Sequence, residues 1–257
     1  MYSYGSGAVI KVPAPSTPDG WIGSEAQYAD AARAAGAPAP RLLDLQQVGG
    51  RTASVWERID APSMWEQVVR RPQRSAPLGR LLADIQHDLF GLVPPVTLPR
   101  QRDRLVSKIR RTAALVDRSL EAALELLPPE TGTPRLCHGD LHPSNVLLGD
   151  DGPMIVDWFD ASRGDPIADV ARSSLTLLGD GVEPPQHLAG ADPAALATLT
   201  AAYLERLDDH LDVDRDLLAR WQAVSAVGRI AEGVPRGPLL EVWARYRWSA
   251  GAQAAAG

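Results

Sequence analysis

The residues most able to do chemistry lie in two short stretches near the middle of the chain. Asp140 and Asn145 stand five residues apart in segment 138–145, and Asp157 follows twelve residues after Asn145, which is the only asparagine among the 257 residues. Mg²⁺ binds carboxylate and amide oxygens while keeping several waters. Phosphoryl transfer needs phosphates that are positioned and neutralised, and little covalent help. The set predicts a site that binds a metal–nucleotide and moves a phosphoryl group.

The spacing also suggests how the three residues divide the work. An Asp followed five residues later by an Asn places the pair at the two ends of one tight loop, which Pro143 stiffens. Asp140 can then face an acceptor hydroxyl while Asn145 faces the metal. Asp157, at the end of the next expected strand, can reach the same cation from the other side.

Lysine is almost as scarce as asparagine, since the chain has 24 arginines but only Lys11 and Lys108. Lys11 lies in the apolar run 8–12, and Glu25 falls in the first half of the helix expected next. A phosphate-binding lysine with an acidic partner is one interpretation. A strand-end lysine and an ordinary helix-surface acid is the other, and spacing alone leaves both open.

These residues need elements to position them, and the first sixty residues indicate strands around one helix. A strand is expected over 9–12 after a turn at 5–7, and a helix over 21–35 that stops at Gly36. Two further strands, 42–46 and 52–57, flank Gly49-Gly50 as a hairpin.

After residue 60 the pattern is mainly helical, with apolar stripes at helical spacing. Ser63 is placed to cap the first of these helices. Strands at 145–148 and 153–157, joined by a turn, would carry the Asn145–Asp157 pair. The expected fold class is therefore α+β, with a small β-rich lobe over residues 1–60, a hinge, and a larger helical lobe over residues 61–257.

Composition excludes several classes of protein. A net charge of −6 and a pI near 5.4 argue against a nucleic-acid binder, and the basic run 100–111 is expected to form a solvated helix face. The single Cys137 is expected to be a buried structural thiol. No apolar stretch approaches the ~20 residues that cross a bilayer, and no signal peptide is visible. We expect a cytoplasmic protein without a membrane partner; no pattern indicates an oligomeric state.

Segment 136–148, which contains His138-Gly139-Asp140 and Asn145, resembles the catalytic loop of the aminoglycoside phosphotransferase family, the small-molecule relatives of protein kinases. Segment 155–158, Ile-Val-Asp-Trp, followed by 164–171, is similar to that family's metal-binding strand and the helix start after it. The combination is far more specific than an isolated His-Gly-Asp. The resemblance implies a protein-kinase-like bilobal fold.

The resemblance also implies roles for individual residues. Asp140 would be the catalytic base for the acceptor hydroxyl, and Asn145 and Asp157 would be the Mg²⁺ ligands. Lys11 would hold the phosphates of ATP or GTP, with Glu25 as its ion-pair partner. The hinge backbone near Glu57 and Ile59 would meet the nucleotide base. Asp165 is expected to cap the following helix, and Asp169 is expected to brace the catalytic loop. Asp160 is expected to be a loop residue.

The acceptor that the resemblance implies is a small molecule with a hydroxyl group, such as an aminoglycoside, another antibiotic, an amino alcohol or a sugar. The acidic balance of the chain favours a cationic acceptor. In one respect the sequence departs from the family. Ten residues precede Lys11, too few for the usual first strand and glycine-rich loop, and the turn at 5–7 leads directly into the strand of Lys11.

Two alternatives follow from these observations. The short N-terminal region favours a catalytically silent kinase-like protein that binds a nucleotide or another ligand. His138 and His142, which flank Asp140, leave open a zinc hydrolase site, although alternation in a loop with glycine and proline makes a poor ligand cage.

Overall fold

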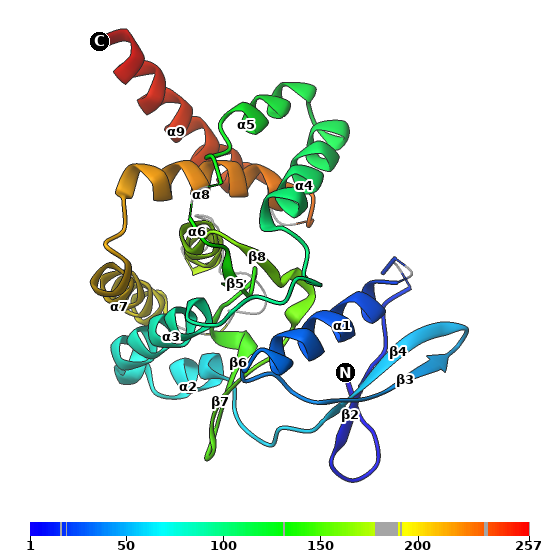
Figure 1. Ribbon diagram of the computed structural model, residues 1–257. Helices are drawn as coiled ribbons and strands as arrows, with labels where there is room; N and C mark the ends of the chain where they lie inside the picture. Colours follow the sequence, from blue (N-terminus) through cyan, green and yellow to red (C-terminus); the bar gives the residue numbers. More distant parts are fainter. Residues whose placement is uncertain are drawn as a thin grey trace.

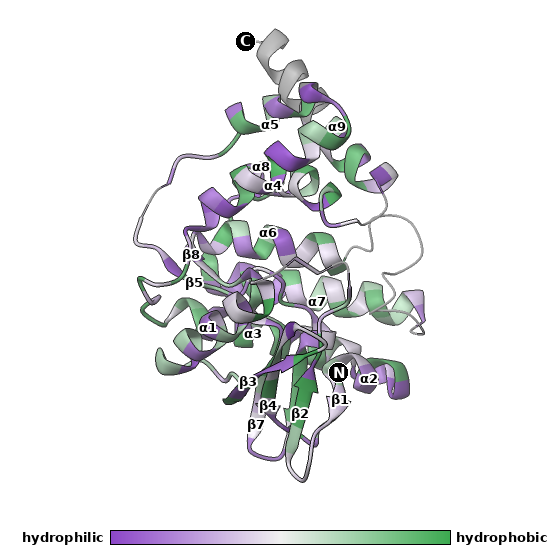
Figure 2. Cartoon of the chain, turned by 90° about the vertical axis from the view of Figure 1, so that its right-hand side faces the viewer, coloured by the Kyte–Doolittle hydropathy of each residue, from purple (hydrophilic) through white to green (hydrophobic). Residues whose placement is uncertain are grey.

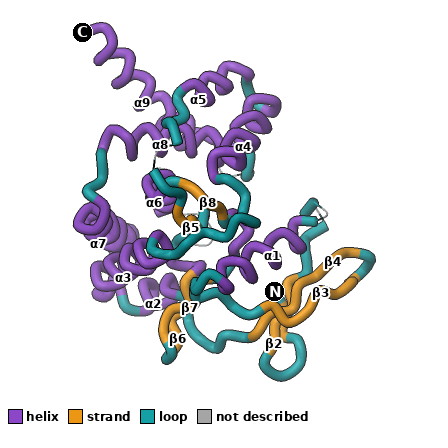
Figure 3. Tube along the Cα trace, viewed as in Figure 1, coloured by secondary structure: helices purple, strands orange, loops and turns teal. Residues whose placement is uncertain are grey.

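A computed structural model describes residues 1–257 apart from 16, 19, 131, 178–189, 191, 234, 235 and 257. The larger sheet lies at one end of the molecule, and helices with short strands among them fill the rest (Figure 1, Figure 3). The sheet is antiparallel, with the order β1-β2-β4-β3, and helix α1 (Trp21–Ala34) packs against it. Its strands are β1 (Tyr2–Ser3), β2 (Ala8–Lys11), β3 (Leu42–Val48) and β4 (Arg51–Glu57).

The larger lobe is mainly helical and also contains two short antiparallel hairpins. Its helices are α2 (Met64–Arg70), α3 (Ser75–Phe90), α4 (Gln101–Leu115), α5 (Ala122–Glu125), α6 (Pro166–Leu177), α7 (Pro193–Leu211), α8 (Arg215–Ile230) and α9 (Arg236–Ala256). The hairpin strands are β5 (Arg135–Cys137) with β8 (Ser162–Gly164), and β6 (Val146–Gly149) with β7 (Gly152–Ile155). Single turns of 3₁₀ helix are η1 (Pro72–Arg74), η2 (Arg118–Glu121), η3 (Pro143–Asn145) and η4 (Trp158–Asp160).

The elements expected from the sequence are present, with boundaries shifted by a few residues. The turn at 5–7 joins β1 to β2, and Tyr4 N donates to Ala8 O at 2.9 Å. Ser63 caps α2 in a reciprocal arrangement, because its hydroxyl accepts from Glu66 N while the Glu66 carboxylate accepts from Ser63 N. In the described residues, β1 is the strand that precedes β2 in this sheet.

Alternation along β2 decides which way Lys11 faces. Ala8 and Ile10 are buried in a small apolar cluster with Ala53 and Val55 of β4. Because successive strand residues point to opposite faces, Val9 and Lys11 lie on the other face of the sheet. Figure 2 shows that β2 is otherwise coloured mainly hydrophobic. A charged side chain is thus held on an apolar strand, facing the interior between the lobes.

The main core joins the two lobes. It includes Ala26 and Ala29 of α1 and Trp56 of β4 together with apolar residues of the helical lobe such as Leu136 and Trp158. Cys137 is buried in the same cluster, as expected for a structural thiol, and burial raises its pKa well above the usual value. None of the helices in the described part of the chain is both long and apolar enough to cross a membrane.

Candidate active site

Three charged side chains from distant parts of the chain meet where the lobes face each other. Lys11 Nζ lies 2.7 Å from Glu25 Oε1 and 3.2 Å from Asp157 Oδ1. Burial disfavours the charged lysine, but the negative charges of Asp157 and Glu25 outweigh this effect, so the pKa of Lys11 is raised. Lys11 therefore keeps a full positive charge at this position, pointing toward the metal-binding residues expected from the sequence.

Helix α1 brings Glu25 to this lysine. Its start packs on η4, where the rings of Trp21 and Phe159 are stacked with their centroids 4.5 Å apart. Its buried face includes Ile22, Ala26 and Ala29, and Glu25 on the same side is only 5% exposed. The helix is thus fixed to the turn that follows Asp157, and this contact sets the distance between the two carboxylates.

Asp157 occupies an unusual backbone conformation. Its φ of 65° and ψ of 62° are left-handed, and in the described residues it is one of two non-glycine residues with positive φ. Such a conformation costs of order 1–3 kcal/mol, and strain of this kind clusters at functional sites. The sharp turn between β7 and η4 leaves the Asp157 side chain 47% exposed beside Lys11.

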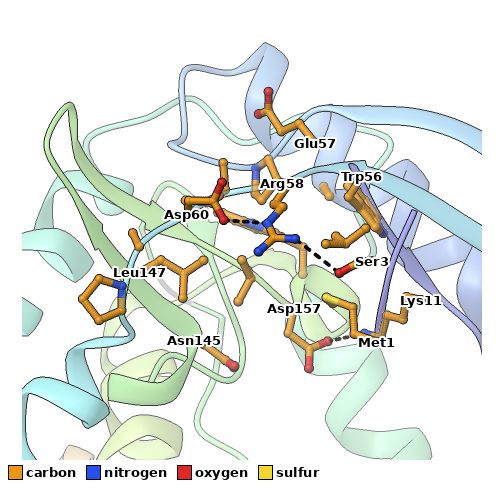
Figure 4. Close-up of a pocket in the computed structure, with 18 of the residues that line it drawn as sticks. Met1, Ser3, Lys11, Trp56, Glu57, Arg58, Asp60, Asn145, Leu147 and Asp157 are labelled. Carbon is orange, nitrogen blue, oxygen red and sulfur yellow. Dashed lines mark hydrogen bonds and ion pairs between the residues drawn. The ribbon is translucent and has the colours of Figure 1, made fainter. Parts of the chain in front are cut away.

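A cavity of about 860 Å³ opens between the lobes beside this cluster. Its lining includes six of the seven residues singled out in the sequence, namely Lys11, Glu25, Glu57, Ile59, Asn145 and Asp157. Figure 4 shows Asn145, Asp157 and Lys11 along one side of this cavity. Apolar residues such as Val9, Trp56 and Leu147 complete the walls, as suits a flat aromatic base.

Asn145 and Asp157 form a donor set suited to a hard cation. Asn145 Nδ2 donates to Asp140 O at 3.0 Å, which orients the amide and leaves Oδ1 as its acceptor atom. A backbone hydrogen bond from Val156 N to Asn145 O, 2.9 Å, ties the two stretches together. One carboxylate and one amide oxygen at the cavity wall match the few protein ligands that Mg²⁺ requires.

At the hinge the side chain of Glu57 is engaged elsewhere. Its Oε1 accepts from Arg41 N at 2.7 Å, and Figure 4 shows it directed away from Lys11 and Asp157. Its backbone N–H donates to Arg41 O at 3.0 Å. Glu57 and Ile59 line the cavity at the segment that connects β4 to the helical lobe.

The loop that carries Asp140 is held in place by backbone contacts. Gly139 has a φ of +80°, and its N–H donates to Asp169 Oδ1 at 2.7 Å. A Cβ at Gly139 would lie 2.8 Å from the carbonyl carbon of Asp160, so the loop and η4 approach as closely as only glycine permits. Asp169 also accepts from Gln86 Nε2 at 2.8 Å, and Asp165 accepts from Ile167 N in the first turn of α6. The structural roles expected for Asp165 and Asp169 are confirmed.

Asp140 lies outside the cavity lining, next to Arg172 of α6. Arg172 NH2 is 3.3 Å from Asp140 Oδ1, and Arg172 Nε donates to Gly139 O at 3.1 Å. Burial opposes ionisation of Asp140, but the positive charge of Arg172 outweighs it, and the pKa of Asp140 lies well below its usual range. The carboxylate is therefore ionised. No pattern in the sequence marked Arg172 as part of the site, because an arginine inside a helix is usually exposed.

Asp160 has a larger part in the site than its sequence context predicts. It was expected to be a loop residue, but its side chain is 13% exposed and pairs with Arg104 at 2.6 Å and Lys108 at 2.8 Å. Both cations come from the basic run 100–111, so the expectation of a fully solvated face is wrong for them; their side chains are 19% and 15% exposed. Burial opposes ionisation of Asp160, but Lys108, Arg172 and Arg104 lower its pKa to about 2.

The histidines that flank Asp140 are not arranged as metal ligands. His138 Nε2 lies 3.1 Å from Val156 O, and His138 Nδ1 accepts from Asp140 N at 3.3 Å. Burial lowers the pKa of His138, which fits this neutral tautomer. Within the described residues, no group of three or more His, Cys, Asp or Glu side chains could hold a metal ion. The geometry therefore argues against the zinc hydrolase alternative.

The fold and the site define a protein-kinase-like phosphotransferase, with a nucleotide-sized cleft between a β-rich and a helical lobe. The model of the phosphotransferase enzyme family matches residues 3–210, and the chain belongs to that family. It is a kinase that acts on hydroxyl groups of small molecules. No curated protein matches the sequence.

Solved structures share the fold at low sequence identity. An aminoglycoside phosphotransferase from Streptomyces rimosus superposes with a TM-score of 0.63 and 18% identity, over 88% of this chain and 88% of that one. A type VIII aminoglycoside-3'-phosphotransferase gives 0.61 and 19%, over 80% and 79%. A choline/ethanolamine kinase family protein from Mesorhizobium loti gives 0.51 and 17%, over 94% and 82%. The expected α+β bilobal kinase fold is confirmed.

Proposed function

We propose that this chain transfers the γ-phosphoryl group of ATP to a hydroxyl of a small acceptor, with Asp140 as the base. The observation that carries the proposal is the position of Lys11. It is ion-paired with Glu25 and Asp157 at the edge of a cavity that Asn145 also lines. A half-buried cation, two oxygen groups able to hold a metal and a nearby ionised carboxylate are the parts that phosphoryl transfer requires.

In the proposed reaction the acceptor hydroxyl oxygen forms a bond to the γ-phosphorus as the bond from that phosphorus to the β-phosphate oxygen breaks. The hydroxyl proton passes to the Asp140 carboxylate, and ADP leaves with the electron pair of the broken bond. Lys11 holds the α- and β-phosphates, and Glu25 keeps its ammonium in place. The backbone at Glu57 and Ile59 lies where the hinge would meet the base.

Mg²⁺ would be held by Asn145 Oδ1 and the Asp157 carboxylate. When bound, it neutralises charge on the phosphate oxygens. Asp157 Oδ1 lies 3.2 Å from Lys11 Nζ, so the cation would share this carboxylate with Lys11. GTP serves as the comparison nucleotide in any binding measurement.

The lobes divide these tasks. Residues 1–60 would form the nucleotide-binding lobe, and residues 61–257 would supply the catalytic loop and the acceptor site. The fold neighbours suggest the acceptor class, since one of them is in complex with ADP and streptomycin and another is a choline/ethanolamine kinase family protein. We therefore expect an alcohol that also carries an amino group, such as an aminoglycoside or an amino alcohol.

The test is ATP consumption in the presence of a panel of aminoglycosides, amino alcohols and sugars, with the Asp140→Ala variant beside the unmodified chain. Removing a general base lowers kcat by about 10²–10⁴-fold. Nucleotide binding should persist in the variant, since Asp140 does not line the cavity. Unchanged turnover in Asp140→Ala would refute the assignment of the base. ATP binding by the unmodified chain without transfer to any acceptor would identify a silent nucleotide-binding protein instead.

A further inference from the structure

Arg172 makes contacts with four separate groups around the catalytic loop. Its Nε donates to Gly139 O at 3.1 Å, and its NH2 lies 3.3 Å from Asp140 Oδ1. NH2 is also 3.7 Å from Asp160 Oδ2, and NH1 is 2.8 Å from Glu232 Oε2. All three guanidinium nitrogens are therefore used, and the side chain is only 12% exposed.

Two of these partners belong to a closed ring of alternating charge. Glu232, just after the end of α8, is 2.7 Å from Lys108 Nζ, and Lys108 is 2.8 Å from Asp160 Oδ2. Asp160 in turn reaches Arg172, which closes the ring Arg172–Glu232–Lys108–Asp160. The second of the two lysines in the chain is thus a member of this ring.

Such a ring is costly to build as a stabilising device. Each buried charge loses hydration worth several kcal/mol, and replacing a buried ion pair by apolar residues is often neutral or stabilising. The ring instead fixes the orientation of the Arg172 guanidinium. Glu232 holds NH1 and Asp160 holds NH2, so that Nε and NH2 stay directed at Gly139 O and Asp140 Oδ1.

We propose that Arg172 is the positioning residue for the catalytic carboxylate of Asp140, and that Lys108, Asp160 and Glu232 hold Arg172 in that role. This inference rests on the proposed function of Asp140 as base. Arg172 engages Oδ1 of Asp140 and the backbone before it. His142 Nε2 lies 3.7 Å from the other carboxylate oxygen, Oδ2, and helps to lower the pKa of Asp140.

Positioning of this kind affects turnover more than nucleotide affinity. Arg172 does not line the interlobe cavity, so the KM for ATP should change by less than about threefold in Arg172→Gln. The kcat per folded molecule should fall by about 10–100-fold, the loss expected when a reacting group is misplaced by about an ångström. Arg172→Lys keeps the charge but cannot reach Gly139 O, Asp140 and Glu232 together, and should recover part of kcat. Glu232→Gln should lower kcat less than Arg172→Gln.

The matched control is Arg220→Gln. Arg220 is a half-buried helix arginine whose Nε donates to Leu126 O at 2.6 Å, away from the catalytic loop. Each kcat is normalised to the folded fraction measured by circular dichroism. Arg172→Gln with the same normalised kcat and KM as Arg220→Gln would overturn the proposal, because Arg172 would then be structural only.

A double-mutant cycle on unfolding tests the contact without any turnover. Urea unfolding is measured for Arg172→Gln, Asp140→Asn, the double variant and the unmodified chain. The proposal expects the two changes to be non-additive, since the residues share one contact. Additive effects would overturn it. If the unmodified chain transfers no phosphoryl group to any acceptor, the proposed function fails, and the cycle alone decides whether Arg172 holds Asp140.

Discussion

Gly139→Ala should disturb the catalytic loop more than any other single methyl group added to the described glycines of this site. The new Cβ would lie 2.8 Å from the Asp160 carbonyl carbon and closer still to its oxygen, where neither backbone can give way cheaply. Overpacking of this kind costs about 1–3 kcal/mol. The φ of +80° adds about 1–2 kcal/mol for a residue with a Cβ. The sum is about 2–5 kcal/mol of unfolding free energy.

For a chain of this length each kcal/mol corresponds to about 2–4 °C in Tm, so the Tm should fall by roughly 4–20 °C. The control is Gly7→Ala, which has a φ of +83° and nothing within 4 Å of the added Cβ. It isolates the conformational cost. Calorimetry or circular dichroism measures both variants, and ATP turnover is compared at a temperature where both are folded. An equal loss of Tm in the two variants would refute the argument that loop and η4 are in forced contact.

Two other changes test the charges of the site. Lys11→Met should lower kcat/KM for ATP by about 10–100-fold, the range expected for a lost charged hydrogen bond. Adding Glu25→Gln, which removes the unpaired carboxylate, should restore stability but not the use of ATP. Restored turnover in the double variant would contradict the role of Lys11. Asp160 has a depressed folded pKa of about 2, so its stabilisation is complete above the ordinary value near 3.8 and is lost as pH falls toward 2. The difference in unfolding free energy between the unmodified chain and Asp160→Asn should therefore shrink by about 1 kcal/mol between pH 5 and pH 3. Urea unfolding at the two pH values measures this difference. A constant difference would show that Asp160 is not ion-paired in the folded state.

Much of the fold was predictable because local signals mark its element boundaries. Glycine pairs and prolines delimit the hairpin β3–β4 and the helix α1, and Ser63 with Glu66 marks the start of α2. The ion pair of Lys11 with Glu25 followed from the family resemblance, whereas the contact of Lys11 with Asp157, 146 residues away, was not predicted. Composition and periodicity predicted the individual helices and strands but not the contacts between them.

The missed part of the site consists of contacts between faces of different helices. Arg104 and Lys108 of α4 have the spacing of a solvated face, yet they turn toward η4 and bind Asp160. Arg172 lies in α6 with no pattern to distinguish it from a surface arginine. Which side of a helix meets a neighbour depends on packing over the whole lobe, and one sequence carries little information about that. A buried ion-pair partner is visible only once both helices are in place.

The stacked rings of Trp21 and Phe159 have a consequence for how the protein can move. They fix the start of α1 to the helical lobe, so Glu25 of α1 moves together with Asp157, which precedes η4, whenever the sheet tilts. Separating such a pair costs about 0.5–1.5 kcal/mol beyond the area exposed. The opening of the cleft that costs least free energy is therefore a rotation of the β1–β2 edge about the Trp21–Phe159 contact. This rotation keeps the distance between the Glu25 and Asp157 carboxylates constant.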